Sequence, residues 1–430
     1  MRGRIARPAP LVLSKSLLAT NPQFRDLWLA GAISRLGDAL YFIGFPFIVR
    51  KLTGDDAMVG YVGALEALPF LLIGPYAGTL ADRLDRRKIM ALSDIASMVI
   101  LVIFGIFAFF AHGDVPREAF LIAAFALSSA RAFFMPAKNA AVPNVVPPEQ
   151  LINANAFTMG TEQAVWLGAM ALSGGFLAAL YAASPSWFLI SILAVDALSF
   201  SLSAYFVARL PRLVPERIVV HRPLREIADG LRYVRTRPEL SAQMLSQLGV
   251  TLFISPFFTV YIATNERWFG GSPSILALIE IAFVSGMLIV SFLVVRMKLR
   301  LVGLAWAYGI AVCGTTILLM GLSPVLWLFW IWNLIAGFAI GFVDIPISTF
   351  VQATVPDELR GRVMSLRQLC FTAPAPIGMV LIALLLPRIG LMPAYVLMGF
   401  GMAAAGLLPL LSRAFRRAEI PADGYATGTL

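Results

Sequence analysis

Six ionisable residues lie well inside long apolar segments of this sequence, where charge is least expected. They are Arg35, Asp38, Glu66, Arg131, Asp196 and Glu280. If the segments cross a membrane, each charge that faces lipid costs roughly 3 kcal/mol, and six would together cost about 18 kcal/mol. A typical fold is stable by only about 5–15 kcal/mol. These side chains are therefore expected to face the interior of a helix bundle, to pair, or to be protonated.

Asp38, Arg35 and Arg131 are the charges whose spacing suggests chemistry. Arg35 and Asp38 are three residues apart, which places them on one face of a helix and allows them to pair. Counted inward from the cytoplasmic ends of their segments, Asp38 and Arg131 are both expected near the middle of the membrane. Burial and neighbouring charge control which protonation state of such groups is stable, so they are candidates for proton transfer. A permanent structural network of the three residues is the alternative. Asp94 and Glu162, nearer the ends of their segments, are expected to be structural.

The composition requires a membrane around these segments. The chain has 430 residues, of which 59% are hydrophobic and 13% charged, and its mean hydropathy is +0.82. Water-soluble domains carry about 25% charged residues, so the chain is not a single soluble globule. Apolar runs such as MVILVIFGIFAFF do not alternate in polarity as the strands of a membrane barrel do, so the spans are expected to be helices.

Twelve apolar segments are each long enough to cross a hydrocarbon core of roughly 30 Å, which takes about 20 helical residues. Their predicted bounds are 26–49, 59–79, 87–111, 118–136, 155–181, 187–208, 243–263, 274–295, 303–321, 325–343, 363–386 and 391–412. The sequence thus predicts an all-α integral membrane protein with two six-helix halves. The expected parts are a tail (1–25), one half (26–208), a linker (209–242), the other half (243–412) and a second tail (413–430).

The distribution of basic residues sets the expected orientation. Cytoplasmic loops retain Lys and Arg. With the N-terminus inside, the outer loops hold few of the 34 basic residues, namely Arg50, Lys51, Arg117, Arg267 and Arg388. We therefore expect both termini to be cytoplasmic and the protein to lie in the plasma (inner) membrane. The net charge of +10 follows from this topology and from contact with anionic lipid, so no nucleic-acid partner is expected.

The sequence offers no site for a metal, a cofactor or enzymatic chemistry. Cys313 and Cys370 fall inside predicted helices, and His112 and His221 fall in loops, so neither a disulfide nor a zinc site is expected. The N-terminus lacks the apolar core of a secretory signal. No P-loop, HExxH motif or nucleophile elbow is found, and the loops are too short for a soluble domain. A membrane sensor or membrane enzyme is the alternative of another class.

The linker between the halves is the longest polar stretch. From Arg209 to Leu240 it contains eight arginines. Its segment PLREIADGLRYV can form a helix with one apolar face, made by Leu224, Ile227, Leu231 and Val234. Such a helix is suited to lie on the inner leaflet of the membrane. A solvated linker is the alternative.

The two halves also repeat each other in sequence. VPPEQLINANAF begins at Val146 and VPDELRGRVMSL at Val355, so that Glu149 matches Glu358 at an offset of 209 residues. Glu66 and Glu280, on the repeat-equivalent second and eighth spans, are separated by 214 residues. Such halves are typical of transporters with a cavity between repeats. We expect the two glutamates to face each other across it, as a cation or proton site, unless they reach out to water.

The stretch GTLADRLDRRKIM, residues 78–90, carries a resemblance to a known family. It resembles the loop motif of the major facilitator superfamily at Gly78, Leu80, Ala81, Asp82, Arg83, Arg86, Arg87 and Ile89, although Asp85 stands where the motif has its second glycine. The segments 21–40, 131–147, 195–204 and 230–240 also resemble the branch that contains macrolide-efflux proteins and enterobactin exporters. The resemblance covers residues 21 to about 412.

The resemblance implies two functional devices. Gly78, Asp82, Arg83, Arg86 and Arg87 are expected to form a latch that holds the cytoplasmic side shut in the outward-facing state. Gly78 would let two helices approach closely there. Asp82 would then lie at a helix N-terminus of the other half, and the arginines would pair with acids or lipid phosphates. In the proton-coupled exporters of the superfamily, an arginine at the position of Arg131 works beside an acid of the first helix. That implies that Asp38 takes up the coupling proton and that Arg131 keeps it ionised until then.

The function expected from these features is export of hydrophobic or amphipathic small molecules, of drug, macrolide or siderophore type, in exchange for protons. An amphipathic pocket is expected to be lined by Tyr41, Phe45, Phe134, Phe253, Trp332 and Asn333. Acids outnumber bases within the predicted spans, which favours cationic or neutral substrates. The proton gradient would supply the energy, without a cofactor, to a monomer. A lysolipid or lipid-linked flippase or uniporter of the same fold is the alternative within transport.

Overall fold

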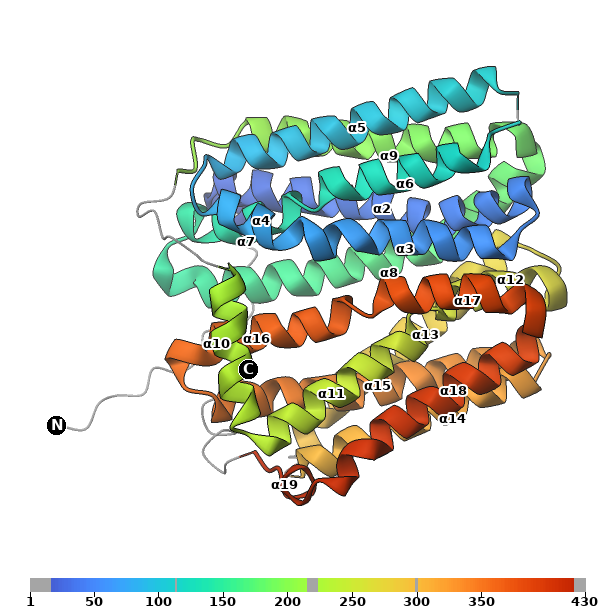
Figure 1. Ribbon diagram of the computed structural model, residues 1–430. Coiled ribbons are helices and arrows are strands. Elements are labelled where there is room, and N and C mark those ends of the chain that lie inside the picture. The colour runs from blue at the N-terminus through green and yellow to red at the C-terminus, as the bar shows by residue number, and fades with distance from the viewer. Residues whose placement is uncertain (1–16, 113, 215–222, 298–300, 421–430) are drawn as a thin grey trace.

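The computed structural model describes residues 17–420 apart from residue 113, residues 215–222 and residues 298–300. The described residues are almost entirely helical, and their one β-bridge is the isolated contact of Leu301 with Glu419. Eleven of their helices are long and apolar enough to cross a membrane, and a twelfth span is formed if one bent pair of helices is counted together. The expected all-α membrane architecture is confirmed (Figure 1).

The helices before the linker form one half of the molecule. They are α2 (Pro22–Thr53), α3 (Asp56–Leu72), α4 (Gly74–Ala81), α5 (Arg86–Phe110), α6 (Arg117–Arg131), α7 (Phe134–Val145), the short η1 (Pro148–Gln150), α8 (Leu151–Ala183) and α9 (Pro185–Ala208). We call this part the N-half. In Figure 1 it occupies the upper part of the view.

The remaining helices comprise the linker helix and the second half, which we call the C-half. The linker helix is α10 (Pro223–Arg235), and the C-half contains α11 (Pro238–Ile254), α12 (Phe257–Trp268), α13 (Pro273–Met297), α14 (Val302–Leu322), α15 (Leu326–Thr354), α16 (Asp357–Thr372), α17 (Ala375–Ile389), α18 (Leu391–Leu407), η2 (Leu408–Leu411) and α19 (Arg413–Arg416). The end of the bundle that carries α10 is called the linker end below, and the opposite end is called the far end (Figure 1).

Four of the predicted spans are broken into two helices, and each break has a proline close by. The proline ring cannot donate a backbone hydrogen bond and collides with the preceding turn, so it is accommodated where a helix ends or begins. These residues are Pro75 near the start of α4, Pro136 in the first turn of α7, Pro256 just before α12 and Pro374 just before α17. The α3–α4 break bends the span by 42°.

The sequence repeat is visible in the backbone. Pro147, at the start of η1, has φ −58° and ψ 146°, and Pro356, at the start of α16, has φ −54° and ψ 144°. Both prolines follow a long helix and set the angle at which the chain turns back into the bundle. The two halves therefore use the same connection at matching places.

Close contacts between the two halves lie toward the far end. A Cβ atom added to Gly60 of α3 would come within 2.8 Å of Met379 O on α17, and one added to Gly174 of α8 would come within 2.6 Å of Ala277 Cβ on α13. Ser274 Oγ also donates a hydrogen bond of 2.8 Å to Gly174 O. Glycine at these positions allows the helix backbones of the two halves to touch.

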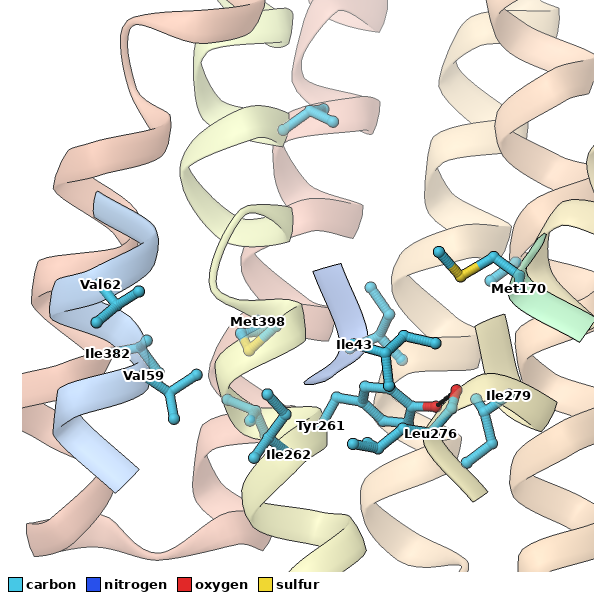
Figure 2. Packing of buried hydrophobic residues seen from close by; sticks show 14 of the residues in the cluster. Ile43, Val59, Val62, Met170, Tyr261, Ile262, Leu276, Ile279, Ile382 and Met398 are labelled. Atoms are coloured by element: carbon cyan, nitrogen blue, oxygen red, sulfur yellow. Dashed lines mark hydrogen bonds between the residues drawn. The ribbon is translucent and has the colours of Figure 1, made fainter. Parts of the chain in front are cut away.

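The same region is a continuous apolar core. Figure 2 shows Val59 and Val62 of α3 beside Ile382 of α17, with Tyr261 of α12 at the centre. The hydroxyl of Tyr261 donates a hydrogen bond of 2.5 Å to Leu276 O at the start of α13. Burial of these side chains joins the halves by packing, and the bond of Tyr261 satisfies its buried polar group.

The linker segment forms the predicted helix, α10, and this helix packs on α16 of the C-half. The carboxylate of Asp229 forms an ion pair with Arg362 Nη1 of α16 at 3.2 Å. A Cβ atom added to Gly230 would lie 2.9 Å from Arg362 O. Val234 is buried and Ile227 packs against the core, while Leu231 is partly exposed. The apolar face of the helix is therefore partly covered by the C-half. The side chain of Leu224 lies outside the described ones.

The crossing of α13 and α15 gives a prediction for stability. A Cβ atom added to Gly337 would overlap the carbonyl oxygen of Phe283, so Gly337→Ala must push the two helices apart. We expect the free energy of unfolding in detergent to fall by about 1–3 kcal/mol. Gly168→Ala is the matched control, because nothing lies within 4 Å of its added Cβ. Equal unfolding curves for the two variants would contradict the close crossing.

Candidate functional site

A pocket of about 340 Å³ lies among the helices of the N-half. Its lining comes from α2, α3, α5, α6, α7, α8 and α9, and combines aromatic with charged side chains. The charged lining residues are Arg35, Asp38, Glu66, Asp94, Arg131 and Lys138. Acids and bases are therefore balanced around the pocket. The expectation that acids outnumber bases did not include Lys138, and it does not hold for this site.

Asp38 and Arg131 form an ion pair at the pocket wall. Asp38 lies on α2, and Arg131 is the last residue of α6, where the break before α7 turns its side chain toward α2. The two side chains are only 19% and 22% exposed. The guanidinium also lies over the rings of Tyr41 and Phe200, at 5.8 and 5.6 Å from their centroids. An ion pair that is mostly removed from water is held strongly, and its loss has consequences for both partners.

Arg35 does not pair with Asp38, although the spacing allowed it. Its guanidinium lies 5.9 Å from the ring centroid of Trp166 on α8, and Asp38 pairs with Arg131. Arg131 comes from another helix and approaches Asp38 across the pocket, whereas Arg35 would need to bend back along its own helix. The expected triad of Arg35, Asp38 and Arg131 is thus reduced to one ion pair with a third charge on the same pocket.

Asp196 lies near the Asp38–Arg131 ion pair but does not line the pocket. It is fully buried on α9, and Ser199 Oγ lies 3.3 Å from its Oδ1. A Cβ atom added to Gly37 of α2 would come within 2.5 Å of Asp196 Oδ1, so glycine is needed there for α9 to approach. Asp196 also interacts electrostatically with Arg131. A second carboxylate therefore contributes to the field around Arg131 without lining the pocket.

Lys138 and Glu162 form a second ion pair, which the sequence analysis missed. Their side chains are 4% and 11% exposed, and Lys138 lines the pocket. A Cβ atom added to Gly31 would come within 2.9 Å of Lys138 Cε. The predicted span ended at residue 136, whereas α7 continues to Val145 and carries Lys138 inside the bundle. The sequence signal was that apolar residues continue after Lys138, at Ala140, Ala141 and Val142, although Pro143 and Asn144 follow them.

Glu66 and Glu280 are not brought together, in contrast to the expectation. Glu66 lines the pocket and accepts a hydrogen bond of 3.1 Å from Tyr41 Oη. Glu280 lies on α13 of the C-half, does not line this pocket, and interacts electrostatically with Tyr261. The two glutamates occupy matching helices of the repeat, but the pocket is formed by one half alone.

Asp94 is the remaining acid of the lining. It lies on α5, is 1% exposed, and accepts a hydrogen bond of 2.7 Å from Ser203 Oγ of α9. The bond joins two helices that pack along most of their length in Figure 1. The expected structural role of Asp94 agrees with this geometry.

The predicted latch segment lies at the linker end, whereas the close contacts between the halves lie toward the far end in this conformation. No heavy atom lies within 4 Å of a Cβ added to Gly78, so this glycine does not permit a close helix contact in this conformation. Asp82 ends α4, where its N–H donates to Gly78 O at 3.2 Å. Asp85, the departure from the family motif, caps α5 and accepts hydrogen bonds of 3.1 Å from Arg87 N and Leu213 N.

The arginines of this segment bind within the N-half. Arg86 donates to Ala81 O at 3.0 Å and also contacts Asn144 at the end of α7. Arg87 Nη1 donates to Leu210 O at 2.8 Å, just after α9. Arg83 is exposed. These bonds tie the turn between α4 and α5 to the ends of α7 and α9, so in this conformation the segment acts as a brace inside one half.

The six residues expected to line a substrate pocket separate into two groups. Tyr41 and Phe134 line the pocket described here. The others are packing residues: Phe45 is fully buried and stacks on Tyr41 at 4.6 Å, and Asn333 donates to Phe329 O at 3.1 Å. Phe253 and Trp332 are partly buried against the core of the C-half. Aromatic residues fill both cores, and sequence alone does not separate them from pocket residues.

Within the part of the chain that the structure describes, no group of three or more His, Cys, Asp or Glu side chains is arranged to hold a metal ion. Cys313 and Cys370 are free and buried. The chemistry available at the pocket is therefore that of paired charges, hydroxyls and aromatic faces.

Comparison with known proteins finds relatives that match most of the chain. A family model described as transmembrane secretion effector matches residues 17–422. The chain is 28% identical over 388 residues to macrolide efflux protein A of Streptococcus pyogenes, covering 88% of this chain and 92% of that protein. It is 25% identical over 398 residues to the multidrug efflux pump Tap of Mycolicibacterium fortuitum, covering 89% and 94%.

Solved structures show the same fold. A point mutant of the nucleoside transporter NupG matches with a TM-score of 0.70 at 14% identity, covering 90% of this chain and 99% of that one. A bacterial homologue of the human lysosomal transporter Spinster, in an inward-facing and occupied conformation, matches with a TM-score of 0.66 at 16% identity, covering 91% and 95%.

Proposed function

The chain belongs to the transmembrane secretion effector family of major facilitator transporters, and from this premise we propose that it exports hydrophobic or amphipathic small molecules in exchange for protons. It is an efflux transporter of the major facilitator type and not an enzyme. The proposal adds a substrate class, an energy source and a site to that description. The observation that carries it is the Asp38–Arg131 ion pair on an aromatic pocket at the centre of the N-half.

The Asp38–Arg131 ion pair suits proton coupling, because Asp38 can be either ionised and paired with Arg131 or protonated and neutral. In its ionised state, which this structure shows, Asp38 neutralises Arg131. A proton on Asp38 breaks the ion pair, and Arg131 is then left with the rings of Tyr41 and Phe200 and with the field of Asp196. A cationic group elsewhere in the pocket favours the ionised form of Asp38 and so opposes its protonation. Proton and substrate therefore exclude each other, which is the condition for their exchange.

Alternating access would give the pocket its two openings. Close contacts between the halves lie toward the far end, at Gly60 with Met379 and at Gly174 with Ala277. This supports a state that is closed at the far end. The linker end carries most of the arginines, so we place it in the cytoplasm of a cell whose plasma membrane holds the protein. The state would then be the one that loads substrate from inside.

Glu66 is the lining carboxylate best placed to meet a cationic substrate. Its described partner is the neutral hydroxyl of Tyr41, whereas Asp38 is already paired with Arg131. Phe42 and Phe70 lie on the same pocket and provide apolar faces for the rest of such a molecule. We therefore propose that an ammonium or similar group of the substrate binds at Glu66 while its apolar part contacts the aromatic wall.

This gives a prediction for binding. Glu66→Gln is expected to weaken the binding of tetraphenylphosphonium by about tenfold, because one carboxylate–cation interaction in a partly desolvated site is worth roughly 1.4 kcal/mol. Glu280→Gln is the matched control, since Glu280 is a half-buried glutamate of α13 that does not line the pocket. Binding is measured by equilibrium dialysis in detergent. Equal losses in both variants would contradict a contact at Glu66.

The proposed function itself is tested in proteoliposomes. Uptake of a fluorescent lipophilic cation against its gradient should require a pH gradient that is acidic on the side receiving the substrate. Collapse of the gradient with nigericin should abolish accumulation. Accumulation that persists without any pH gradient would exclude proton exchange.

A further inference from the structure

We propose that two ion pairs between α2, α3 and α12 form the gate that closes the far end of the molecule, with Asp56 as its central residue. The proposal rests on alternating access, the mode of transport proposed above, and assigns residues that the sequence analysis treated only as loop charges. It is independent of what the pocket binds and of how protons are coupled.

Asp56 is shared by two arginines from different halves. It is the first residue of α3, and its side chain is 4% exposed. Its Oδ1 pairs with Arg50 Nε at the end of α2, and its Oδ2 pairs with Arg267 Nη2 of α12. Both oxygens of one buried carboxylate are therefore used, one within the N-half and one across to the C-half.

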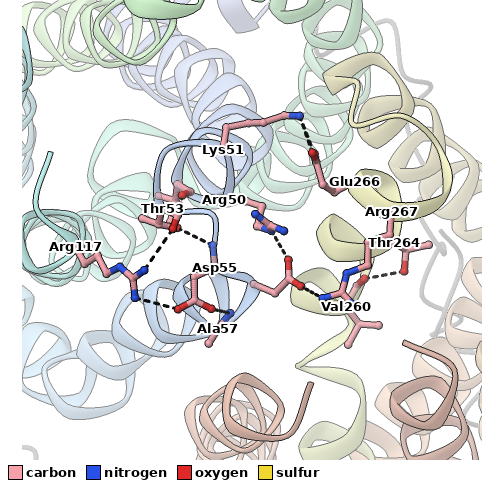
Figure 3. Close-up of polar contacts among 12 residues, drawn as sticks. Arg50, Lys51, Thr53, Asp55, Ala57, Arg117, Val260, Thr264, Glu266 and Arg267 are labelled. Carbon is pink, nitrogen blue, oxygen red and sulfur yellow. Dashed lines mark hydrogen bonds and ion pairs between the residues drawn. The ribbon is translucent and has the colours of Figure 1, made fainter. Parts of the chain in front are cut away.

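A second ion pair crosses beside the first. Lys51 Nζ lies 2.8 Å from Glu266 Oε2, with the two side chains 23% and 29% exposed. Consecutive residues of α2, Arg50 and Lys51, thus meet consecutive residues of α12, Glu266 and Arg267, as Figure 3 shows. Lys51 binds the acid of α12 directly, whereas Arg50 and Arg267 are joined through Asp56, so the pairing also fixes the register between the halves.

The loop after α12 closes over this cluster. Gly271 has φ +67°, a conformation that favours glycine, and its N–H donates to Asn265 O at 2.9 Å. A Cβ atom added to Gly271 would overlap Glu266 Oε2 and would lie 2.8 Å from Lys51 Nζ. The loop therefore packs against the Lys51–Glu266 pair, which remains partly exposed.

Asp55 and Asp56 are neighbours with different tasks. Asp55 caps α3 by accepting a hydrogen bond of 2.9 Å from Ala57 N, and it pairs with Arg117 Nη1 at 3.2 Å, which lies in the same half. Figure 3 shows this contact beside the gate. Asp55 holds the turn between α2 and α3, while Asp56 binds the other half. Substitution of Asp55 therefore provides a matched control for substitution of Asp56.

The arrangement explains how the gate can open without leaving a bare charge. If α12 moves away, Asp56 loses Arg267 but keeps Arg50, which belongs to its own half. An unpaired buried carboxylate would be a large barrier. Arg50 remains bound in both states, so only the crossing pairs must be exchanged for water. The gate is thus strong enough to favour the closed state and still reversible.

The test is a charge exchange read out as a distance. Spin labels are placed on cysteines introduced at Leu52, at the exposed end of α2, and at Arg388, at the far end of α17, in a background lacking Cys313 and Cys370. Distance distributions are measured by double electron–electron resonance in detergent. Lys51→Glu or Glu266→Lys alone is expected to raise the long-distance population by about tenfold. The double variant is expected to restore the short distance.

Further variants decide between a gate and a general loss of structure. Asp56→Asn should increase the long-distance population as the single reversals do. Asp55→Asn should not, since asparagine caps a helix as well as aspartate. Restoration by the double exchange cannot come from misfolded protein. The proposal is overturned if the double variant stays open, or if neither single reversal changes the distances. Asp38→Asn, which tests the coupling account, leaves this result unaffected.

Discussion

Replacing Asp38 with asparagine is expected to abolish proton-driven export while the protein still folds and binds substrate. Asparagine has the shape of aspartate but cannot take up a proton or neutralise Arg131, whose ion pair with Asp38 lies at the pocket wall. Arg131 would retain its contacts with the rings of Tyr41 and Phe200. Accumulation of a lipophilic cation driven by a pH gradient in proteoliposomes should fall to the level of protein-free vesicles.

The matched control for this variant is Asp94→Asn. Asp94 is another lining carboxylate, but its bond is to the hydroxyl of Ser203 and not to a cation. We expect its substitution to leave a pH-driven component of export. Counterflow, the exchange of labelled for unlabelled substrate without a gradient, should survive in Asp38→Asn because it needs no proton. Normal pH-driven export by Asp38→Asn would refute the assignment of Asp38.

Removal of Lys138 is expected to cost the most stability of any single change at the site. Lys138→Met leaves Glu162 buried with no cation beside it, and such losses cost about 3–5 kcal/mol of unfolding free energy. The double variant Lys138→Met with Glu162→Leu removes both charges and should recover most of this stability, since apolar pairs often replace buried ion pairs without loss. Unfolding in detergent, followed by circular dichroism, measures both.

This comparison separates the ion pair from the volume of the side chain. Methionine fills nearly the same space as the lysine stem, so a large loss in the single variant reports the uncompensated glutamate. A single variant as stable as the original protein, or a double variant no better than the single one, would contradict a buried pair at this place.

The spans were predictable because hydrophobic length is a local property. A helix needs about 20 apolar residues to cross lipid, and each predicted segment has them whatever it packs against. The repeat between Val146 and Val355 was predictable for the same reason, since it is written in the residues themselves. The breaks near Pro75, Pro136, Pro256 and Pro374 could be suspected from proline, but the size of a bend depends on the packing of neighbouring helices.

The pairing of charges was predictable only where competition between partners was absent. The spacing of Arg35 and Asp38 allows a pair, yet Arg131 reaches Asp38 from another helix and Arg35 lies on Trp166. Lys138 was missed because a span was ended two residues too early, and its partner lies on α8, which no local pattern indicates. These outcomes depend on how helices turn relative to one another.

The far-end cluster was overlooked because its basic residues were used only to predict the topology. Arg50, Lys51 and Arg267 were used to set the orientation of the chain, because few basic residues fall on that side. Their scarcity there is also a functional clue, since the ones retained are paired with Asp56 and Glu266. Charges that break a topological rule therefore call for a search for partners in the opposite half.

The central claim is that proton and substrate compete at Asp38, and proton release tests it most directly. Purified protein in weakly buffered detergent solution is mixed with a lipophilic cation, and the pH change is followed with a dye for the original protein and for Asp38→Asn. The account expects release from the original protein and none from the variant, although both bind the cation. Binding by the original protein without any release would contradict proton coupling, and would favour a uniporter or lipid flippase of the same fold.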